Sequence, residues 1–474
     1  MKADTIIVFV LSAFSLSFCF FGLACDDSSS SDDDDSSTEP TPAGDDDASP
    51  VDDDNDDSSP PDAAVFRAGF AQVDITPKVS TPLAGFGMEF FSADNLRWST
   101  GTHDPLYAQA AAFEDADGQA LILIATDLVG LIANEVKQIQ AGLATELAIE
   151  PERVIVAATH NHHGPDTIGL WGVILPPISG RNEDVMTMIV KKSIAAGVRA
   201  WEAREPAALT VAAGDEPRMH FNKHERGDPQ ALIDNTLSVL FAWNEEGEML
   251  GSLMNWPCHV TEMIPENTLY SADFAGAYYQ AMQEGAGGIH LFFNGALGGN
   301  IQPLSLDDPW HDWVFNDRDW HDVEAMGDQL AADVFTLAER ASPVSDPRIQ
   351  ILAATEYEVA NENILFWLAS DVGLTPRDIP PPGGVSKSTV TIVSIGKVML
   401  GTLPGEWAPD YAFELRELMG GRAQFLIGLG NDWIGYALTE REYDNFTYLY
   451  DRSLAPSRET GEELLAVYRA VFAR

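Results

Sequence analysis

Basic side chains are scarce in this chain of 474 residues, where 27 Lys and Arg stand against 74 Asp and Glu for a formal charge of −47. Recognition of nucleic-acid phosphates needs a basic surface, so this balance excludes nucleic acid as a partner. Hydrophobic residues make up 45% of the chain and aromatic residues 9%, which is enough for a full-sized core. We therefore expect an acidic globular protein.

Cysteine is also scarce, and Cys19, Cys25 and Cys258 cannot build a disulfide framework. No cysteine-protease signature surrounds Cys258, which we interpret as a small buried apolar residue. The sequence lacks a Walker motif, a Rossmann fingerprint and a G-x-S-x-G elbow. Nothing in the composition fixes the oligomeric state.

Long apolar runs are missing except near the start of the chain. Residues 6–21 follow Lys2 and have the length of a signal-peptide core, which is short for a membrane span. The sequence Gly22-Leu23-Ala24-Cys25 resembles a bacterial lipobox, so we expect residues 1–25 to be a lipoprotein signal with Cys25 as the lipidation site. The expected location is the bacterial cell envelope, with a lipid anchor in the membrane. The alternative is a simple secretory signal and a secreted protein.

Residues 26–63 consist mainly of Asp, Ser and Pro, and they hold 16 acidic residues with no Lys or Arg. Such a segment cannot bury enough apolar surface to offset the entropy of ordering, and its like charges repel. We expect a disordered linker between the anchor and a folded domain. Calcium binding by the Asp runs is the less favoured alternative.

Residues 64–474 read as a single large domain of mixed α/β (α+β) class, with mixed sheets flanked by helices. The patterns predict helices over residues 133–148, 184–202, 320–340, 409–419 and 461–473. They predict strands over residues 68–76, 106–114, 120–126, 154–159, 236–243, 249–255, 290–294, 349–356, 389–395 and 398–403. A hairpin is expected at the turn Asp115-Ala116-Asp117-Gly118.

The densest polar signal is Thr159-His160-Asn161-His162-His163, which follows the apolar strand 154–158. In an extended chain His160 and His162 point to the same face. Two imidazoles on one face suit a borderline metal such as zinc. The alternative for this segment alone is a surface cluster without function.

Three further segments carry polar residues at the ends of expected strands, and each has an ordinary structural explanation when taken alone. His259 follows strand 249–255 and could be a hydrogen-bonded core histidine. Glu406 lies in Pro404-Gly405-Glu406, close to the start of helix 409–419, where the helix dipole favours its ionised form. Tyr436, at the end of Asn431–Tyr436, could be a core aromatic, although a tyrosine beside a cation can also bind it. The glycines of Gly298-Gly299-Asn300 allow a close backbone approach.

Taken in order, these segments resemble the catalytic domain of the neutral/alkaline non-lysosomal ceramidase family, over about residues 66–474. The segments that carry the resemblance are Ala68–Pro77, His103–Ala108, Ala125–Leu128, Thr159–His162, His259 followed by Ser271-Ala272-Asp273, Pro404–Glu406 and Asn431–Tyr436.

The resemblance implies a zinc ion held by His160, His259, Glu406 and Tyr436. It implies catalytic roles for His162, facing the substrate, and for Tyr448, polarising the substrate carbonyl. The remaining residues that it marks as supporting the ligands or contacting substrate are Asp127, Lys223, Ser271, Asp273 and Asn300. Lys223 lies near a position where the family has Arg. Asp127 and Asp273 could equally be cap or turn residues.

Two departures from the family pattern bear on the substrate more than on the metal. The family's Gly-Asp-Val-Ser-Pro-Asn reads Gly299-Asn300-Ile301-Gln302-Pro303 here, and a glutamine cannot attack a carbonyl as the proposed serine would. The C-terminal immunoglobulin-like domain of well-known members is expected to be missing.

A zinc-activated water survives the loss of the serine. The hypothesis is therefore a zinc-dependent amidohydrolase (EC 3.5.1.-) acting on an N-acyl lipid such as ceramide, in sphingolipid metabolism. The alternatives are a zinc hydrolase of another acyl ester, lactone or amide, and a surface lipoprotein that binds ligand without turnover. Apolar stretches at residues 308–315 and 364–368 could cover the site, although core packing explains them as well.

Overall fold

The computed structural model describes residues 65–226, 231–304 and 318–473. The expected signal (1–25), the expected linker (26–63) and the apolar stretch at 308–315 lie outside the described residues. The chain from Ala64 onward folds as one unit. In the part of it that the structure describes, no helix has both the length and the apolar character to cross a membrane.

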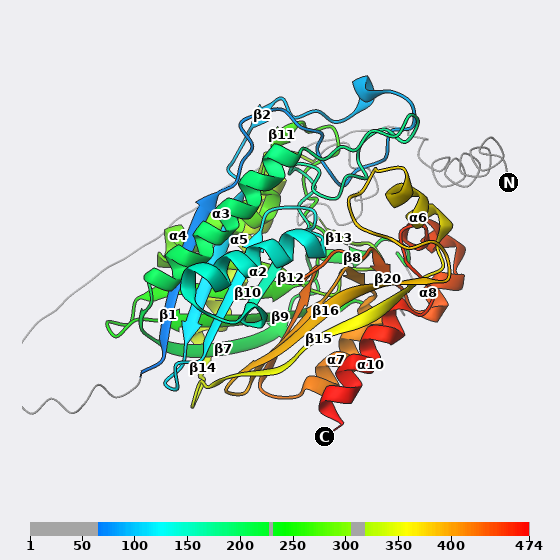
Figure 1. Cartoon of the computed structure of the whole chain (residues 1–474). Helices are drawn as coiled ribbons and strands as arrows, with labels where there is room; N and C mark the ends of the chain where they lie inside the picture. Colours follow the sequence, from blue (N-terminus) through cyan, green and yellow to red (C-terminus); the bar gives the residue numbers. More distant parts are fainter. Residues whose placement is uncertain (1–64, 227–230, 305–317, 474) are drawn as a thin grey trace, which may run out of the picture. The chain divides into compact units, whose positions relative to one another are not determined.

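The first sheet has the order β5-β4-β3-β1-β6 and carries two helices on one face (Figure 1). Its strands are β1 (Arg67–Asp74), β3 (Tyr107–Glu114), β4 (Ala120–Thr126), β5 (Val154–Ala158) and β6 (Glu205–Pro206), and its helices are α2 (Ala133–Leu147) and α3 (Glu183–Glu202). The expected hairpin is confirmed, because β3 and β4 pair antiparallel with Glu114 opposite Ala120. β5 then adds parallel to β4.

The second sheet has the order β12-β10-β9-β7-β14, and the helices α4 and α5 pack against each other beside it. Its elements are β7 (Ala208–Asp215), β9 (Thr236–Trp243), β10 (Met249–Trp256), α4 (Asp273–Ala286), β12 (Ile289–Asn294), α5 (Trp320–Glu339) and β14 (Ser342–Pro343). β10 and β12 run parallel.

The third sheet has the order β15-β16-β17-β19, with the helices α7 and α10 near it (Figure 1). Its elements are β15 (Ile349–Asn361), β16 (Gly384–Ile395), β17 (Val398–Leu403), α7 (Pro409–Met419), β19 (Ala423–Gly428) and α10 (Thr460–Phe472). β17 and β19 run parallel. The short helix α6 (Ile364–Asp371) lies in the connection between β15 and β16.

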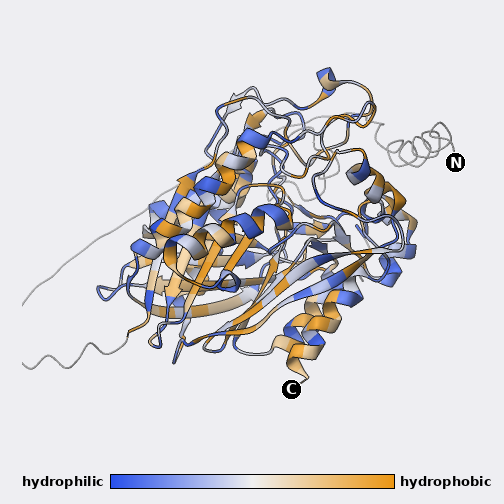
Figure 2. Ribbon diagram, viewed as in Figure 1, coloured by the Kyte–Doolittle hydropathy of each residue, from blue (hydrophilic) through white to orange (hydrophobic). Residues whose placement is uncertain are grey.

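The three sheets share one apolar core, in which Leu123 of β4, Leu253 of β10 and Leu400 of β17 belong to a single buried cluster. β4 is buried along its whole length, and strands of this kind read as continuous apolar runs (Figure 2). Burial of each such side chain is worth about 1.5–3 kcal/mol. The packed sheets therefore form a rigid support for the segments that leave the strand ends.

The parallel pairs β4/β5, β10/β12 and β17/β19 each end in a segment that carries polar residues. Three short two-stranded ladders lie outside the large sheets: β2 (Gly101–Thr102) with β11 (Leu269–Tyr270), β8 (His220–Asn222) with β13 (Ile301–Pro303), and β18 (Glu406–Trp407) with β20 (Tyr436–Ala437). The carboxyl ends of parallel strands are a common place for binding sites.

Every expected helix and strand is present, with most ends displaced by a residue or two. β15 and β16 are longer than expected: residues 357–361 of β15 alternate buried with more exposed side chains, and residues 384–387 of β16 alternate half-buried with exposed ones. The sequence reading missed β7, β19, α4 and α6. The mixed α/β fold class is confirmed.

Candidate metal centre

His160 lies just past the end of β5 and is buried. Its φ of +68° is left-handed, so the chain is not extended at this residue. The expectation that an extended chain places His160 and His162 on one face was therefore wrong in its premise. The Nδ1 atom of His160 lies 2.7 Å from the carbonyl oxygen of Val129. Because a carbonyl only accepts, Nδ1 carries the proton and Nε2 presents its lone pair to the site.

His259 follows β10 and is held in the same way. Its Nδ1 lies 2.8 Å from the carbonyl oxygen of Ile301, and its own backbone N–H donates to that oxygen at 2.9 Å. Its side chain is only 2% exposed, and burial lowers its pKa, against the opposing effect of nearby Glu406. His259 therefore also presents a neutral Nε2.

Glu406 of β18 meets both imidazoles. Its Oε2 atom lies 3.4 Å from Nε2 of His160 and 3.5 Å from Nε2 of His259, and among the described residues Oε2 has no hydrogen-bond donor. Its Oε1 atom accepts the indole N–H of Trp433 at 3.2 Å. Burial raises the pKa of Glu406, but His160 and His259 outweigh it and hold the pKa well below its usual range.

These contacts test whether the site fits a cation. A buried carboxylate oxygen faces two imidazole nitrogens, and the outer nitrogen of each ring already carries the proton. Without a proton or a cation between them, these three electron-rich atoms would repel one another in a buried site, and the lowered pKa of Glu406 reflects the same need for positive charge beside it. A divalent cation between them removes this repulsion, and nitrogen and carboxylate ligands suit zinc. The residues therefore fit a metal.

Tyr436 joins this group through the backbone. It is the register partner of Glu406 in the parallel ladder of β18 and β20, and burial raises its pKa well above the usual value, with Glu406 adding to the shift. The turn before Glu406 needs glycine, because Gly405 has φ +86° and a Cβ there would lie 2.3 Å from the carbonyl oxygen of Gly435. Residues Pro404-Gly405-Glu406 thus bring Glu406 next to Tyr436.

His162 is the third imidazole of the cluster. Its Nε2 lies 3.2 Å from Nε2 of His160, and the ligand atoms of His160, His162 and His259 all lie within 4.8 Å of one another. Burial lowers the pKa of His162 well below its usual value, and the neighbouring histidines and Arg97 add to the shift. The geometry allows His162 either as a third nitrogen ligand or as a neutral base beside the metal.

The sequence reading missed the residues that hold His162. Gly85 packs against the ring, Phe86 meets it edge-on with ring centroids 5.0 Å apart, and an Nη1–H of Arg97 donates to the carbonyl oxygen of His162 at 3.3 Å. These residues lie outside regular secondary structure, and no local pattern marked them. Trp433 was also missed, although it lies inside the Asn431–Tyr436 segment.

The expectation that Asp127 and Asp273 fix the ligating imidazoles was wrong. Backbone carbonyls occupy both Nδ1 positions, as described above. The carboxylate of Asp127 instead accepts the backbone N–H of Tyr107 at 2.8 Å and the hydroxyl of Tyr279 at 3.0 Å. Burial raises its pKa to about 7. Asp127 also supports the site through the backbone, because its carbonyl oxygen accepts the side-chain amide of Asn161.

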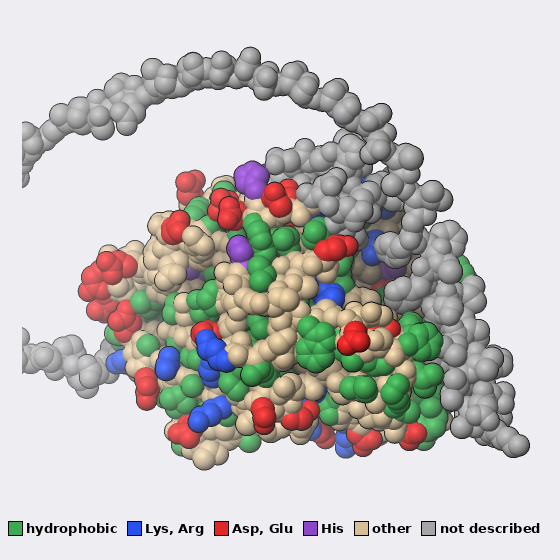
Figure 3. Space-filling view, turned by 90° about the horizontal axis from the view of Figure 1, so that it is seen from above, with side chains coloured by type: hydrophobic (Ala, Val, Ile, Leu, Met, Phe, Trp, Pro, Cys, Tyr) green, Lys and Arg blue, Asp and Glu red, His purple; other side chains and the backbone are tan. Residues whose placement is uncertain are grey.

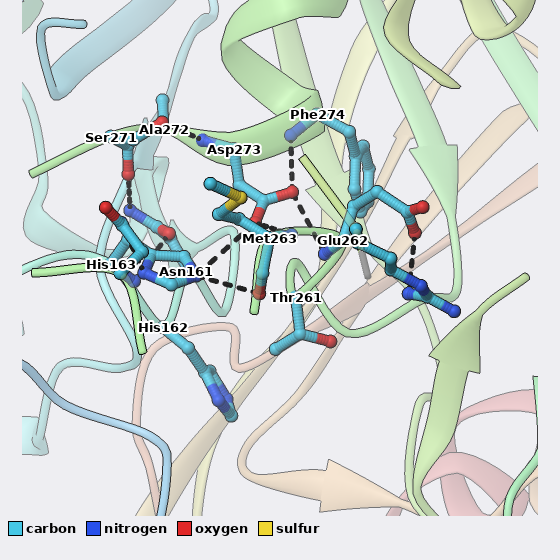
Figure 4. A network of polar contacts seen from close by, with 12 residues as sticks. Asn161, His162, His163, Thr261, Glu262, Met263, Ser271, Ala272, Asp273 and Phe274 are labelled. Carbon is cyan, nitrogen blue, oxygen red and sulfur yellow. Dashed lines mark hydrogen bonds and ion pairs between the residues drawn. The ribbon is translucent and has the colours of Figure 1, made fainter. Parts of the chain in front are cut away.

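Asp273 and Ser271 order the chain beneath the histidine segment (Figure 4). Asp273 accepts the backbone N–H groups of Glu262 and Met263 at 3.1 and 2.9 Å, and burial raises its pKa to about 6. The side chain of Asn161 donates to the carbonyl oxygen of Ser271 at 2.7 Å. Both residues therefore hold the loops on either side of the site and do not touch the candidate ligands His160 and His259.

Tyr448 and Lys223 lie on the segments beside β8. The hydroxyl of Tyr448 donates to Oε1 of Glu225 at 3.0 Å, and its ring lies 4.4 Å from that of His224. The backbone N–H of Lys223 donates to the carbonyl oxygen of Asn300 at 3.2 Å, and burial lowers the pKa of its side chain. Glu225 and His224, which the sequence reading did not mark, thus surround the expected catalytic tyrosine.

Gln302 stands in β13, where the family pattern has serine. Its side-chain amide donates to Oδ1 of Asn300 at 2.5 Å and its Oε1 accepts the hydroxyl of Thr261 at 3.0 Å. Asn300 itself has φ +58°. Gln302 therefore joins Asn300 and Thr261 in a small polar network. Thr261 lies two residues after His259 in the chain.

The fold and the site together define a mixed α/β protein with a buried histidine–glutamate centre suited to a divalent metal. Residues 66–288 match the family model described as neutral/alkaline non-lysosomal ceramidase, N-terminal. The resemblance seen in the sequence is thus confirmed over that region.

Two curated relatives match part of the chain. It is 26% identical to the neutral ceramidase of Pseudomonas aeruginosa over 257 residues, which are 51% of this chain and 38% of that protein. It is 24% identical to neutral ceramidase A of Dictyostelium discoideum over 234 residues, which are 45% of this chain and 31% of that protein. The matches thus span only 38% and 31% of the length of these relatives.

Two solved structures share the fold. The crystal structure of neutral ceramidase from Pseudomonas aeruginosa aligns with a TM-score of 0.64 at 18% identity, covering 86% of this chain and 75% of that one. A structure described as ceramidase complexed with C2 aligns with a TM-score of 0.67 at 20% identity, covering 86% and 74%. At these identities the likeness establishes the fold.

Proposed function

We propose that this protein is a zinc-dependent hydrolase that cleaves the amide bond of an N-acylated lipid of the ceramide type. The observation that carries the proposal is the convergence of His160, His259 and Glu406 on one buried point, at 3.4 and 3.5 Å. The family match over residues 66–288 and the names of the matched relatives support the substrate class. We further propose residues 64–474 as the catalytic domain.

His160, His259, Glu406 and Tyr436 would hold the metal in this proposal. When bound, zinc supplies a Lewis acid and lowers the pKa of water toward neutrality. The Nδ1–H contacts to Val129 and Ile301 fix each imidazole with Nε2 inward, as outer hydrogen bonds do for metal-binding histidines. Trp433 fixes Glu406 from the opposite side.

His162 and Tyr448 would handle protons and charge. Because burial keeps His162 neutral, its imidazole can take a proton from the attacking water and return it to the leaving amine. The raised pKa of Tyr448 keeps its hydroxyl protonated, so it can donate to the developing oxyanion once it turns away from Glu225. Gln302 has no nucleophilic oxygen, so the proposal contains no acyl-enzyme.

Metal analysis of the full chain tests the proposal. We expect one zinc per chain and hydrolysis of an N-acylsphingosine in the wild type and in the control variant, and loss of both in His160→Ala. His290→Ala is the matched control. This buried histidine of β12 contacts the side chain of Ser252 and the carbonyl oxygen of Gly287 and is not one of the proposed ligands. A folded wild type without stoichiometric metal, or equal loss in both variants, contradicts the metal assignment.

A second function is favoured by one observation, the glutamine at position 302. Its amide is held by Asn300 and Thr261 and fills the place of the family's serine. This change supports either a zinc hydrolase of another ester, lactone or amide, or a protein that binds acyl ligands without turnover. A panel of acyl substrates separates these functions: hydrolysis of one non-ceramide class selects the first, and bound zinc without any turnover selects the second.

We also propose that the chain is exported and anchored to the bacterial cell envelope through a lipid on Cys25. The signal-like residues 1–25 and the acidic segment 26–63 support this proposal. Labelling with a fatty acid in cells, compared between the wild type and Cys25→Ser, tests it. Equal labelling of the two chains, or none in the wild type, would exclude the anchor.

A further inference from the structure

Two loops that start close to the histidine cluster join into one apolar projection. The backbone N–H groups of Ile174 and Leu175 donate to the carbonyl oxygens of Glu89 and Phe90 at 3.0 and 2.9 Å, and Val173 pairs with Ile178 across the second loop. These contacts fix the two loops side by side. We call the group Phe90, Phe91 and Ile174–Ile178 the apolar tip.

The apolar tip exposes large side chains to solvent. Phe91 is 63% exposed and Ile178 is 48% exposed, and Pro176 and Pro177 in the second loop are also exposed. Exposed residues of this size normally scatter singly over a surface. Here they are gathered by main-chain hydrogen bonds, so their exposure is built into the loops.

Charge is nearly absent from both loops. Residues 171–180 contain no charged residue, and in residues 86–98 only Asp94 among the charged residues is exposed. The carboxylate of Glu89 turns back and accepts the backbone N–H groups of Phe91 and Ser92 at 2.8 and 3.2 Å. The chain has a formal charge of −47, and the tip exposes no basic group that could attract an anionic surface. The tip is therefore suited to an uncharged surface.

Both loops that form the tip start close to the candidate active site. The first loop leaves Gly85 and Phe86, which touch His162, and the second loop follows the histidine segment through Asp166. Asp166 fixes the start of that loop by accepting the backbone N–H of Trp171 at 2.9 Å. In Figure 1 the blue segment with the short helix Ala93–Asn95 projects at the top of the view, and the view from above shows apolar side chains among scattered acidic ones (Figure 3).

We propose that the apolar tip inserts into the interface of a membrane of uncharged or zwitterionic lipid and places the active site against the bilayer. This inference rests on the proposed function, because a lipid substrate must leave a bilayer to be cleaved. Aromatic and aliphatic side chains without charge are typical of segments that enter the lipid interface. A stable protein interface needs about 800 Å² on each partner and a polar rim, and seven apolar residues with one exposed acid nearby do not provide it.

A probe on the tip tests insertion without any need for turnover. The full chain carrying Ile178→Cys is labelled with an environment-sensitive fluorophore and mixed with phosphatidylcholine vesicles that contain brominated acyl chains. We expect a blue shift of the emission and quenching by the bromine atoms. Phe413→Cys on α7, at an exposed apolar position outside the tip (46% exposed), is the control. Any lipid on Cys25 is present in both chains, so it cannot produce a difference between them.

Equal quenching at both positions, or none at position 178, overturns the proposal. Vesicles of phosphatidylglycerol should give a weaker response at position 178 than phosphatidylcholine, because the chain is strongly acidic. A stronger response on the anionic vesicles would mean attraction by charge and would also overturn it. The probe readout remains valid if the protein hydrolyses nothing, so failure of the tip is distinguishable from failure of the proposed function.

Activity gives a second readout. In Phe91→Ser/Ile178→Ser we expect hydrolysis of substrate embedded in vesicles to fall about tenfold or more, because two large side chains no longer enter the lipid. Hydrolysis of a soluble short-chain N-acyl substrate should stay unchanged. The control Phe413→Ser/Val385→Ser removes one aromatic and one aliphatic side chain of similar exposure elsewhere and should change neither rate. An equal loss on both substrates in the tip variant contradicts a role at the membrane.

Discussion

Gly85 lies against the imidazole of His162 so closely that a Cβ on Gly85 would come within 2.1 Å of Cγ of the ring. The backbone of Gly85 also has φ +95°, a conformation that residues with a Cβ rarely adopt. On the far side, Nε2 of His162 contacts His160. The ring is therefore held between a glycine and the candidate metal ligands, and its position depends on the missing side chain of residue 85.

Gly85→Ala should displace His162 and lower kcat by about tenfold or more, since small misplacements of a catalytic group have effects of this size. The matched control is Gly87→Ala, because Gly87 also has a positive φ of +56° but nothing lies within 4 Å of its added Cβ. Both variants should lose about 1 kcal/mol or more of stability from backbone strain. Measurement of kcat and of the unfolding midpoint separates the two effects. If Gly87→Ala loses as much kcat as Gly85→Ala, contact with His162 is not the cause.

Trp433→Phe should weaken metal binding about tenfold, because it removes the indole N–H that donates to Oε1 of Glu406 at 3.2 Å. Groups that orient metal ligands typically contribute 10- to 100-fold to metal affinity. Competition with a zinc chelator measures the effect. Trp407→Phe is the control, since this equally buried indole donates to the carbonyl oxygen of Pro404 at 2.8 Å. Equal losses in the two variants would point to packing as the source of the effect.

The sequence allowed prediction of much of the fold, because the long strands and helices carry strong apolar patterns. β4, β9 and β17 begin and end as expected, since their apolar runs are bounded by turns. α4 was missed because two of its glycines weaken the helical pattern. These glycines have a tertiary role: a Cβ at Gly276 would meet the side chain of Asp104, and one at Gly285 would meet the ring of Phe335.

The candidate site was less predictable than the fold. Residues with ligand chemistry, such as His160 and Glu406, could be marked from their type and their place after strands. The groups that hold these ligands in place could not be predicted, because they are backbone carbonyls, such as that of Ile301, and every residue type carries one. The left-handed backbone of His160 is also invisible in the sequence, since it results from packing between β5 and the loops around it.

Tyr448 and Glu225 should act as a unit in catalysis, because the tyrosine hydroxyl donates to Oε1 of Glu225 at 3.0 Å. Glu225→Gln weakens this contact and changes the direction in which the hydroxyl points, while Tyr448→Phe removes the hydroxyl. We expect each single variant to lower kcat and the double variant to lower it little further than Tyr448→Phe alone. The coupling free energy should lie at about 0.5–3 kcal/mol.

A double-mutant cycle with Tyr411→Phe is the control for this pair. Tyr411 is a buried tyrosine whose hydroxyl donates to the carbonyl oxygen of Leu438 at 3.3 Å. Its effect should add to that of Glu225→Gln. Additive losses for Glu225 and Tyr448 as well would show that Glu225 acts without the tyrosine.

Glu442 should make the folded state less stable as the pH rises from about 4.5 to 7. Burial raises its pKa to about 7, and the charge of Asp410 adds to the shift, while hydrogen bonds from Thr439 oppose it. Between the unfolded and folded pKa values the native state holds a proton that the unfolded state has lost, so stability falls with rising pH across this window. The loss is on the order of 3 kcal/mol and is complete above about pH 7.

Glu442→Gln removes this titration and keeps the cap of α8 (Glu440–Asp444), because Gln can also close a capping box with Thr439. Denaturant unfolding between pH 4.5 and 8 measures the free energy of unfolding for both chains. The variant should match the wild type near pH 4.5 and exceed it by a growing margin up to about pH 7, where the difference levels off. Glu440→Gln, at an exposed position of the same helix, should leave the profile unchanged. A variant that is less stable than the wild type at pH 8 would mean that ionised Glu442 stabilises the fold.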